Sequence, residues 1–177
     1  MSKTTNMVKA AIFLALGLLI PYIFHVTGVA GQIFLPMHVP VLLCGFILGP
    51  RYGLIVGFIT PLFNAVLTGM PPIYPTAFAM AFELATYGWI TGWLYKIKNK
   101  NVFVSLIIAM LLGRMVSGAA NYILLGFAGE KYVLTMFLMS SFVKCIWGII
   151  IQLILVPLII KTVETENTKG MARANEQ

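Results

Sequence analysis

Long apolar runs, separated by short segments rich in Gly, Pro or Lys, make up almost the whole chain. The first run lies within residues 1–24, after a basic start, and the others cover 39–49, 52–67, 76–95, 102–127 and 132–160. A membrane-spanning helix needs ~20 mostly apolar residues, and most of these runs approach or exceed that length. The pattern predicts an all-α membrane protein, a compact bundle of six transmembrane helices with short loops.

The number of crossings depends on residues 39–67, which could form one long kinked helix or two short ones. Lys3, Lys9 and the three lysines of 96–100 belong on the cytoplasmic side, because short cytoplasmic loops carry an excess of Lys and Arg. An even number of crossings must therefore separate these two groups, which requires two passes within 39–67. Both termini are then cytoplasmic, as are nine of the twelve Lys and Arg residues.

Composition supports a membrane protein. Of the 177 residues, 60% are hydrophobic and 10% charged, against roughly 45–50% and about 25% in soluble domains. The net charge of +7 does not indicate nucleic-acid binding, since there are too few polar residues to build a wet, basic groove. Cys44 and Cys145 both lie inside apolar runs, and without a Cys or His cluster no metal or cofactor is expected.

The chain divides into one transmembrane domain, 1–163, and a polar cytoplasmic tail, 164–177, which we expect to be disordered. The first apolar run has features of a signal peptide, but the rest of the chain is equally hydrophobic, so the run is more simply the first of several spans. Four glycines, Gly45, Gly49, Gly53 and Gly57, recur every four residues. This spacing indicates close packing between helices.

Three charged residues, Glu83, Arg114 and Lys144, fall inside predicted spans. A charge in the bilayer is expensive and marks either a function or a paired structural site. From the rise of a helix, Glu83 lies about 12 Å below the outer face, and the two cations about 18–20 Å below it. All three could line one cavity open to the outside. If Glu83 neutralises one cation, the other remains for a carboxylate ligand; the alternative is an ion pair that only fixes helix packing.

Helical spacing gives these charges polar neighbours. Arg114, Ser117 and Asn121 form one stripe, Glu83 and Tyr87 stack at i, i+4, and Ser140, Ser141 and Trp147 lie within a turn of Lys144. The candidate ligand-binding residues are His38, Asn64, Tyr74, Glu83, Tyr87, Arg114, Asn121, Lys144 and Trp147. Segments 25–38 and 68–75 connect the spans on the outer side, and we expect them to form a lid over the site.

Several motifs of catalysis are missing. The chain has no Gly-x-x-x-x-Gly-Lys-Ser/Thr loop, so it does not bind ATP through a P-loop. It also has neither a Gly-x-Ser-x-Gly nucleophile elbow nor a His-Glu-x-x-His motif, and it contains no aspartate. We therefore do not expect an enzyme. The two halves, 1–95 and 96–177, show no convincing inverted repeat, which weakens the case for a transporter that works alone.

Two local patterns resemble a known family. Ala11-x-x-x-Ala15 is a small-residue motif in the first span, and Leu-Pro-Met-His-Val-Pro-Val-Leu-Leu-Cys-Gly-Phe-Ile-Leu-Gly-Pro-Arg-Tyr-Gly covers 35–53. The second pattern continues to Pro61-Leu and Thr68-Gly-Met-Pro-Pro. Over about residues 7–161 the chain resembles the substrate-binding S component of energy-coupling factor (ECF) vitamin transporters.

The resemblance implies a mechanism. Such a subunit captures a vitamin from outside with high affinity, docks through residues corresponding to Ala11 and Ala15 on a transmembrane coupling subunit, and topples in the bacterial cytoplasmic membrane to release it. Two partner ATP-binding-cassette ATPases hydrolyse the ATP. The sequence of 70–84 resembles a branch associated with pantothenate, whose carboxylate suits a surplus cation. The alternative is a self-sufficient secondary transporter or channel for a small metabolite.

Overall fold

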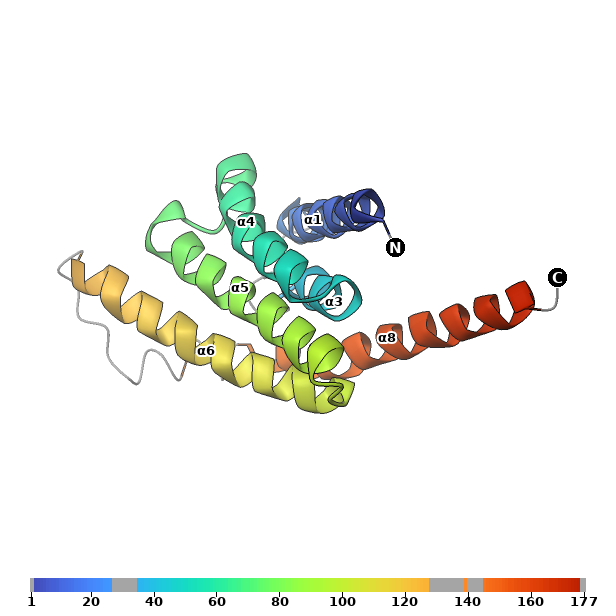
Figure 1. Ribbon diagram of the computed structural model, residues 1–177. Helices are drawn as coiled ribbons and strands as arrows, with labels where there is room; N and C mark the ends of the chain where they lie inside the picture. The colour runs from blue at the N-terminus through green and yellow to red at the C-terminus, as the bar shows by residue number, and fades with distance from the viewer. Residues whose placement is uncertain (1, 27–34, 128–138, 140–144, 176–177) are drawn as a thin grey trace.

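The computed structural model describes residues 2–26, 35–127, 139 and 145–175, and every regular element within these ranges is helical (Figure 1). The α-helices of this part of the chain are α1 (Lys3–Val26), α3 (His38–Leu48), α4 (Pro50–Thr68), α5 (Phe78–Gly92), α6 (Val102–Phe127) and α8 (Ile146–Asn175). Two π-helical turns, η1 (Ile73–Ala77) and η2 (Trp93–Ile97), flank α5. The predicted all-helical fold is confirmed.

Four of these helices, α1, α4, α6 and α8, are long and apolar enough to cross a membrane. Helix α3 has 11 residues and spans only about 16 Å at the rise of an α-helix, roughly half the thickness of a hydrocarbon core. Helix α5 continues directly into η2 at its C-terminal end. At its N-terminal end it follows η1, in which Tyr74 has non-helical backbone angles. The last predicted run, 132–160, lies partly outside the described residues.

Helices α3 and α4 are separated at Gly49. This residue has φ +96°, a left-handed conformation that glycine adopts without steric cost. Pro50 follows in the first turn of α4, where a missing N–H leaves no hydrogen bond unmade. The structure thus confirms two helices within 39–67. Gly49 serves this turn, and no atom lies within 4 Å of a Cβ built there. Its backbone also packs against α5, because a Cβ at Gly92 would lie 2.5 Å from the Gly49 carbonyl carbon.

Helix α5 lies at the centre of the bundle, between α4 and α6 (Figure 1). Helix α3 packs against α4 and α5 and also contacts α8, whereas α1 packs only on α3 and α4 among the stronger helix contacts. One apolar core joins α3, α5, α6 and α8 through Leu42, Phe46, Tyr87, Leu106 and Val156. This arrangement turns one face each of α3, α5 and α6 toward the others, and these faces carry the polar side chains described below.

Glycines allow α4 and α5 to touch through their backbones. A Cβ at Gly53 would lie 2.3 Å from the carbonyl oxygen of Gly88, and one at Gly57 would lie 2.3 Å from that of Leu84. From α3, a Cβ at Gly45 would lie 2.4 Å from the same Gly88 oxygen. The packing predicted for these three glycines is confirmed. The four-residue repeat did not indicate Gly88, the glycine of α5 that faces Gly45 and Gly53.

The prediction of a disordered tail is wrong for most of its length, because α8 continues to Asn175. Glu, Lys, Met, Ala and Arg in 164–173 are favourable helix formers. A helix already nucleated in the apolar run needs only one more hydrogen bond for each residue it adds. Tyr95 of η2 also donates a hydrogen bond to the Glu164 carboxylate, which holds α8 at the point where the polar segment begins.

We expect Gly88→Ala to lower the melting temperature of the purified protein. The new Cβ would lie 2.2 Å from the carbonyl oxygen of Gly53, and forcing the helices apart costs about 1–3 kcal/mol. Thermal unfolding in detergent measures the effect. Gly126→Ala is the matched control, since no atom lies within 4 Å of its Cβ, and it should be neutral or stabilising. Equal melting temperatures for both variants would contradict the backbone contact.

Candidate ligand-binding site

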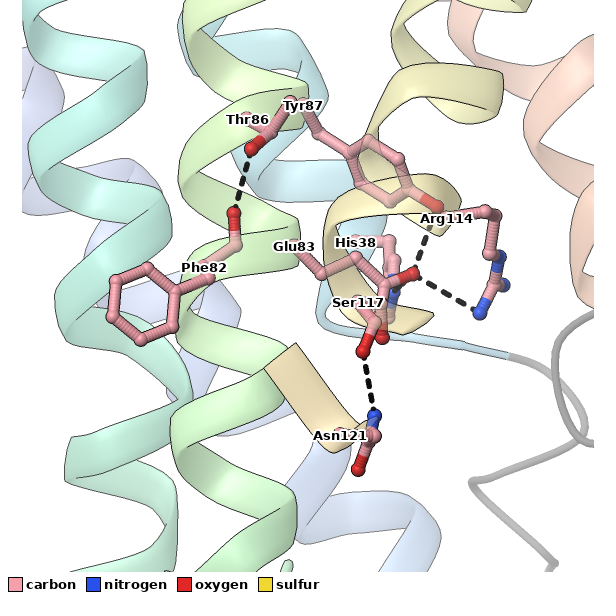
Figure 2. A network of polar contacts seen from close by, with 8 residues as sticks. All are labelled: His38, Phe82, Glu83, Thr86, Tyr87, Arg114, Ser117 and Asn121. Carbon is pink, nitrogen blue, oxygen red and sulfur yellow. Dashed lines mark hydrogen bonds and ion pairs between the residues drawn. The ribbon is translucent and has the colours of Figure 1, made fainter. Parts of the chain in front are cut away.

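A buried carboxylate, Glu83, is the centre of a polar cluster inside the bundle (Figure 2). Its Oε1 lies 3.0 Å from Nη1 of Arg114 and accepts a hydrogen bond of 2.8 Å from the Tyr87 hydroxyl. Nε2 of His38 is 3.7 Å from the same oxygen, and the His38 and Tyr87 rings are 5.5 Å apart. All four side chains are buried, so charges far apart in the sequence meet as predicted.

Three helices position these groups. Glu83 and Tyr87 are one turn apart on α5, and His38 is the first residue of α3. Gly113 of α6 leaves room for the phenol, because a Cβ there would lie 2.1 Å from the Tyr87 ring. The local sequence therefore fixes the carboxylate and the hydroxyl on α5, while the small residue on α6 lets the two helices close around them.

The polar stripe on α6 is present as predicted. Arg114 and Ser117 are both buried, and Ser117 lies beside the Glu83 carboxylate (Figure 2). Asn121, one turn further on, is partly buried and donates its side-chain N–H to the backbone oxygen of Ser117 at 2.8 Å. Asn121 thus extends the stripe from the cluster toward the end of α6, with its amide oxygen facing away from that bond.

The structure identifies Arg114 as the cationic partner of Glu83, a choice that the sequence left between Arg114 and Lys144. The 3.0 Å contact joins α5 to α6. Removing two charges from water costs several kcal/mol for each ion, and a close pair with further hydrogen bonds is needed to offset that cost. Lys144, with Ser140 and Ser141, lies outside the described residues.

Part of the Arg114 guanidinium is unused. Its Nε and Nη2 are buried and have no hydrogen-bond partner among the residues that the structure describes, and the same holds for both ring nitrogens of His38. Nε and Nη2 are neighbouring donors of one planar fork, which matches the two oxygens of a carboxylate. A buried donor without a partner costs about 1–3 kcal/mol, so this free edge is the best candidate for contact with a ligand.

Asn64, also a candidate ligand residue, uses its amide to hold α1. Its Nδ2 donates to the backbone oxygen of Gly17 at 2.9 Å and lies 3.3 Å from that of Thr60. In a regular helix the Gly17 carbonyl would accept the N–H of residue 21, but this residue is Pro21, which has none. Asn64 supplies the missing donor from α4, so both of its N–H groups are directed at the backbone.

The remaining described candidates lie apart from the cluster. Tyr74, 47% exposed, donates a hydrogen bond to the backbone oxygen of Leu124 and so ties segment 68–75 to the end of α6. Trp147 is 61% exposed on α8. Of the other expected lid segment, 25–38, residues 27–34 lie outside the described part. The structure brings together His38, Glu83, Tyr87 and Arg114, with Asn121 next to them, but neither Tyr74 nor Trp147.

Two buried residues at and within α8 were not singled out from the sequence. Cys145 is buried close to Arg114, and Gln152 is fully buried two turns further along the chain. Gln152 could have been recognised from the sequence as a neutral amide within an apolar run. Like a charge, such a group needs a hydrogen-bond partner in a membrane.

Ala11 and Ala15 lie on the exposed face of α1. Large apolar side chains surround them, including Val8, Ile12 and Leu16, which are also exposed. The two alanines thus form a shallow strip on a helix face that none of the described helices covers.

Four described helices of membrane-spanning length, together with an ion pair buried between α5 and α6, are typical of a multi-pass membrane protein. The sequence matches the family described as ECF transporter, substrate-specific component, over residues 5–160, and the chain belongs to this family. Members of this family are substrate-binding subunits of membrane transporters and not enzymes, and membership implies partnership with a transmembrane coupling subunit and ATPases. Comparison with curated proteins and with solved structures gives no match.

A double-mutant cycle tests the role of Asn64. We expect Asn64→Leu to lower the free energy of unfolding by about 1–3 kcal/mol, because the Gly17 carbonyl loses its donor in a dry interior. In a Pro21→Ala background the same substitution should cost much less, since the alanine introduced there can donate from its own N–H. Unfolding of all four proteins in detergent measures the coupling. Additive effects would show that Asn64 does not replace the proline's missing bond.

Proposed function

We propose that this chain is the high-affinity capture subunit of an ATP-driven importer for a small vitamin that bears a carboxylate, with pantothenate as the first candidate. It lies in the bacterial cytoplasmic membrane, binds the vitamin from the outer side, and releases it inside when the partner ATPases act. The proposal names the ligand class and the direction of transport, which go beyond family membership.

The unused edge of Arg114 is the observation that carries the proposal. A carboxylate placed there would satisfy Nε and Nη2 together, and neither atom has a partner among the described residues. The Glu83–Arg114 pair is neutral as a whole, so a further cation must balance an anionic ligand. Lys144, predicted at a similar depth, is our candidate for that cation.

Pantothenate is favoured by sequence and by chemistry. Segment 70–84 resembles the branch associated with this vitamin, and pantothenate carries one carboxylate together with an amide and two hydroxyl groups. His38 and Asn121 are polar neighbours of the Arg114 edge that could contact such groups. Native mass spectrometry of the purified protein tests the assignment, since a tightly held vitamin would add its mass to the protein ion. A bound molecule without a carboxylate would contradict the proposed ligand class.

We further propose six membrane crossings with both termini in the cytoplasm. The division of 39–67 into α3 and α4 supports the two passes that the distribution of lysines requires. Helix α3 is short, so its ends rely on neighbouring helices for cover. In this topology the outer ends of α4 and α6 lie on the ligand's side of the membrane, where the bond between Tyr74 and Leu124 holds segment 68–75.

Arg114→Lys should weaken pantothenate binding at least tenfold while leaving the protein folded. Lysine keeps a positive charge opposite Glu83 but removes the two-pronged edge. Pantothenol, which has a CH2OH group in place of the carboxylate, provides the second measurement. The unsubstituted protein should prefer pantothenate to pantothenol, and the variant should lose most of that preference.

Arg51→Lys is the matched control for this experiment, because Arg51 is exposed at the start of α4, away from the cluster. It should bind both compounds like the unsubstituted protein. Unchanged affinity and unchanged preference in Arg114→Lys would overturn the assignment of the carboxylate to Arg114. Isothermal titration in detergent or nanodiscs measures both quantities.

Ala11→Trp should block assembly with the coupling subunit and leave vitamin binding intact. The bulky indole would fill the strip between the exposed side chains of α1, and small residues are what let two membrane helices approach closely. Co-purification of the full complex measures assembly. Leu111→Trp, on the exposed face of α6, is the control and should assemble normally. Normal assembly of the Ala11 variant would exclude this strip as the docking surface.

A further inference from the structure

Gln152 is the most unusual neutral side chain of the described interior. It is fully buried in α8, and neither its Nε2 nor its Oε1 has a hydrogen-bond partner in the part of the chain that the structure describes. A buried amide usually finds partners for both atoms. Leaving both atoms unpaired in an apolar interior costs free energy, which a bound molecule would recover by supplying their partners.

Asn64 shows what a structural amide looks like in the same bundle. It is equally buried, but its N–H groups are directed at backbone oxygens of Gly17 and Thr60, where they fasten one helix to another. Gln152 fastens nothing among the described residues. Among the described residues, two fully buried side chains thus carry an amide: Asn64 uses it for packing, and that of Gln152 has no partner there.

Gln152 lies on the face of α8 that is turned toward the polar cluster. Cys145, the residue before α8 and seven positions earlier, lies close to Arg114. Val156, one turn later, packs in the core with Tyr87, whose hydroxyl binds Glu83. Seven residues correspond to about 10 Å along a helix. The unpaired amide is therefore displaced from the level of the Arg114 edge by roughly the length of a small vitamin.

We propose that Gln152 is a second ligand contact, which binds a neutral amide or hydroxyl group of the same molecule whose carboxylate lies at Arg114. The inference rests on the proposed function. An amide side chain both donates and accepts, so it suits a group that does the same. The ligand class narrows to a carboxylic acid that carries an amide or hydroxyl group further along its chain, and an apolar tail at that end would leave Gln152 unpaired.

The effect of Gln152→Met on the melting temperature distinguishes a ligand contact from a structural role. Methionine has a similar shape without polar atoms, so the vitamin-free protein should keep its melting temperature or gain stability. Binding of pantothenate and of pantothenol should weaken by the same factor, roughly tenfold. The preference between the two compounds should stay unchanged, because that preference depends on Arg114.

Ser105→Ala is the matched control. Ser105 is also buried with an unpaired hydroxyl, but it lies on α6 one turn from Ala109, which packs against Ile90 and Leu94 of α5 and η2. Its removal should leave the affinity for both compounds unchanged. Measurements use the full chain in detergent, with melting temperature read before and after titration.

Three results would overturn the inference. A clear loss of melting temperature in vitamin-free Gln152→Met would show that the amide stabilises the fold. Unchanged affinity for pantothenate and pantothenol would show that it does not reach the ligand. If the unsubstituted protein binds neither compound and carries no small molecule in native mass spectra, then the proposed function itself fails, and the role of Gln152 with it.

Discussion

The contact between Glu83 and Arg114 lies where water cannot screen or replace it, and much of the bundle is arranged to keep it closed. It joins α5 to α6 at 3.0 Å, with the Tyr87 hydroxyl on the same carboxylate oxygen. Gly113 of α6 has no side chain, which leaves room for the Tyr87 ring against that helix. The glycine thereby lets the Tyr87 hydroxyl reach the Glu83 carboxylate of the ion pair. Separating the ions without replacement would leave two uncompensated charges in a medium of low dielectric constant.

The same physical constraint applies to backbone groups. Pro21 removes a donor from α1, and Asn64 replaces it from α4 across 47 positions of sequence. Gly53 and Gly88 allow α4 and α5 to approach until their backbones touch. In a medium without water, each polar group must find its partner inside the protein. The close packing of these helices brings such partners within hydrogen-bonding distance.

Much of this arrangement could be predicted from the sequence, because charges in apolar runs are rare and helical spacing is regular. Glu83, Tyr87 and Arg114 were found in this way. The partner of Glu83 could not be chosen, since the rotation of each helix about its axis depends on contacts between side chains far apart in the chain. The hydrogen bonds of Asn64 depend on how α1 packs against α4, which the sequence does not show. The sequence also does not show that Trp147 lies on the exposed side of α8. The helical tail was misjudged because polar composition was taken as disorder, although a helix already formed in the apolar run can continue into a polar segment.

Helix α1 contributes no side chain to the described polar cluster, and it reaches the rest of the bundle through α3 and α4. The helix that carries the exposed alanine strip is therefore separate from the helices that surround Glu83. Residues on α5, α6 and α8 can change during evolution without altering the outer face of α1. The proposed docking surface can thus remain constant while the interior diverges toward different small molecules.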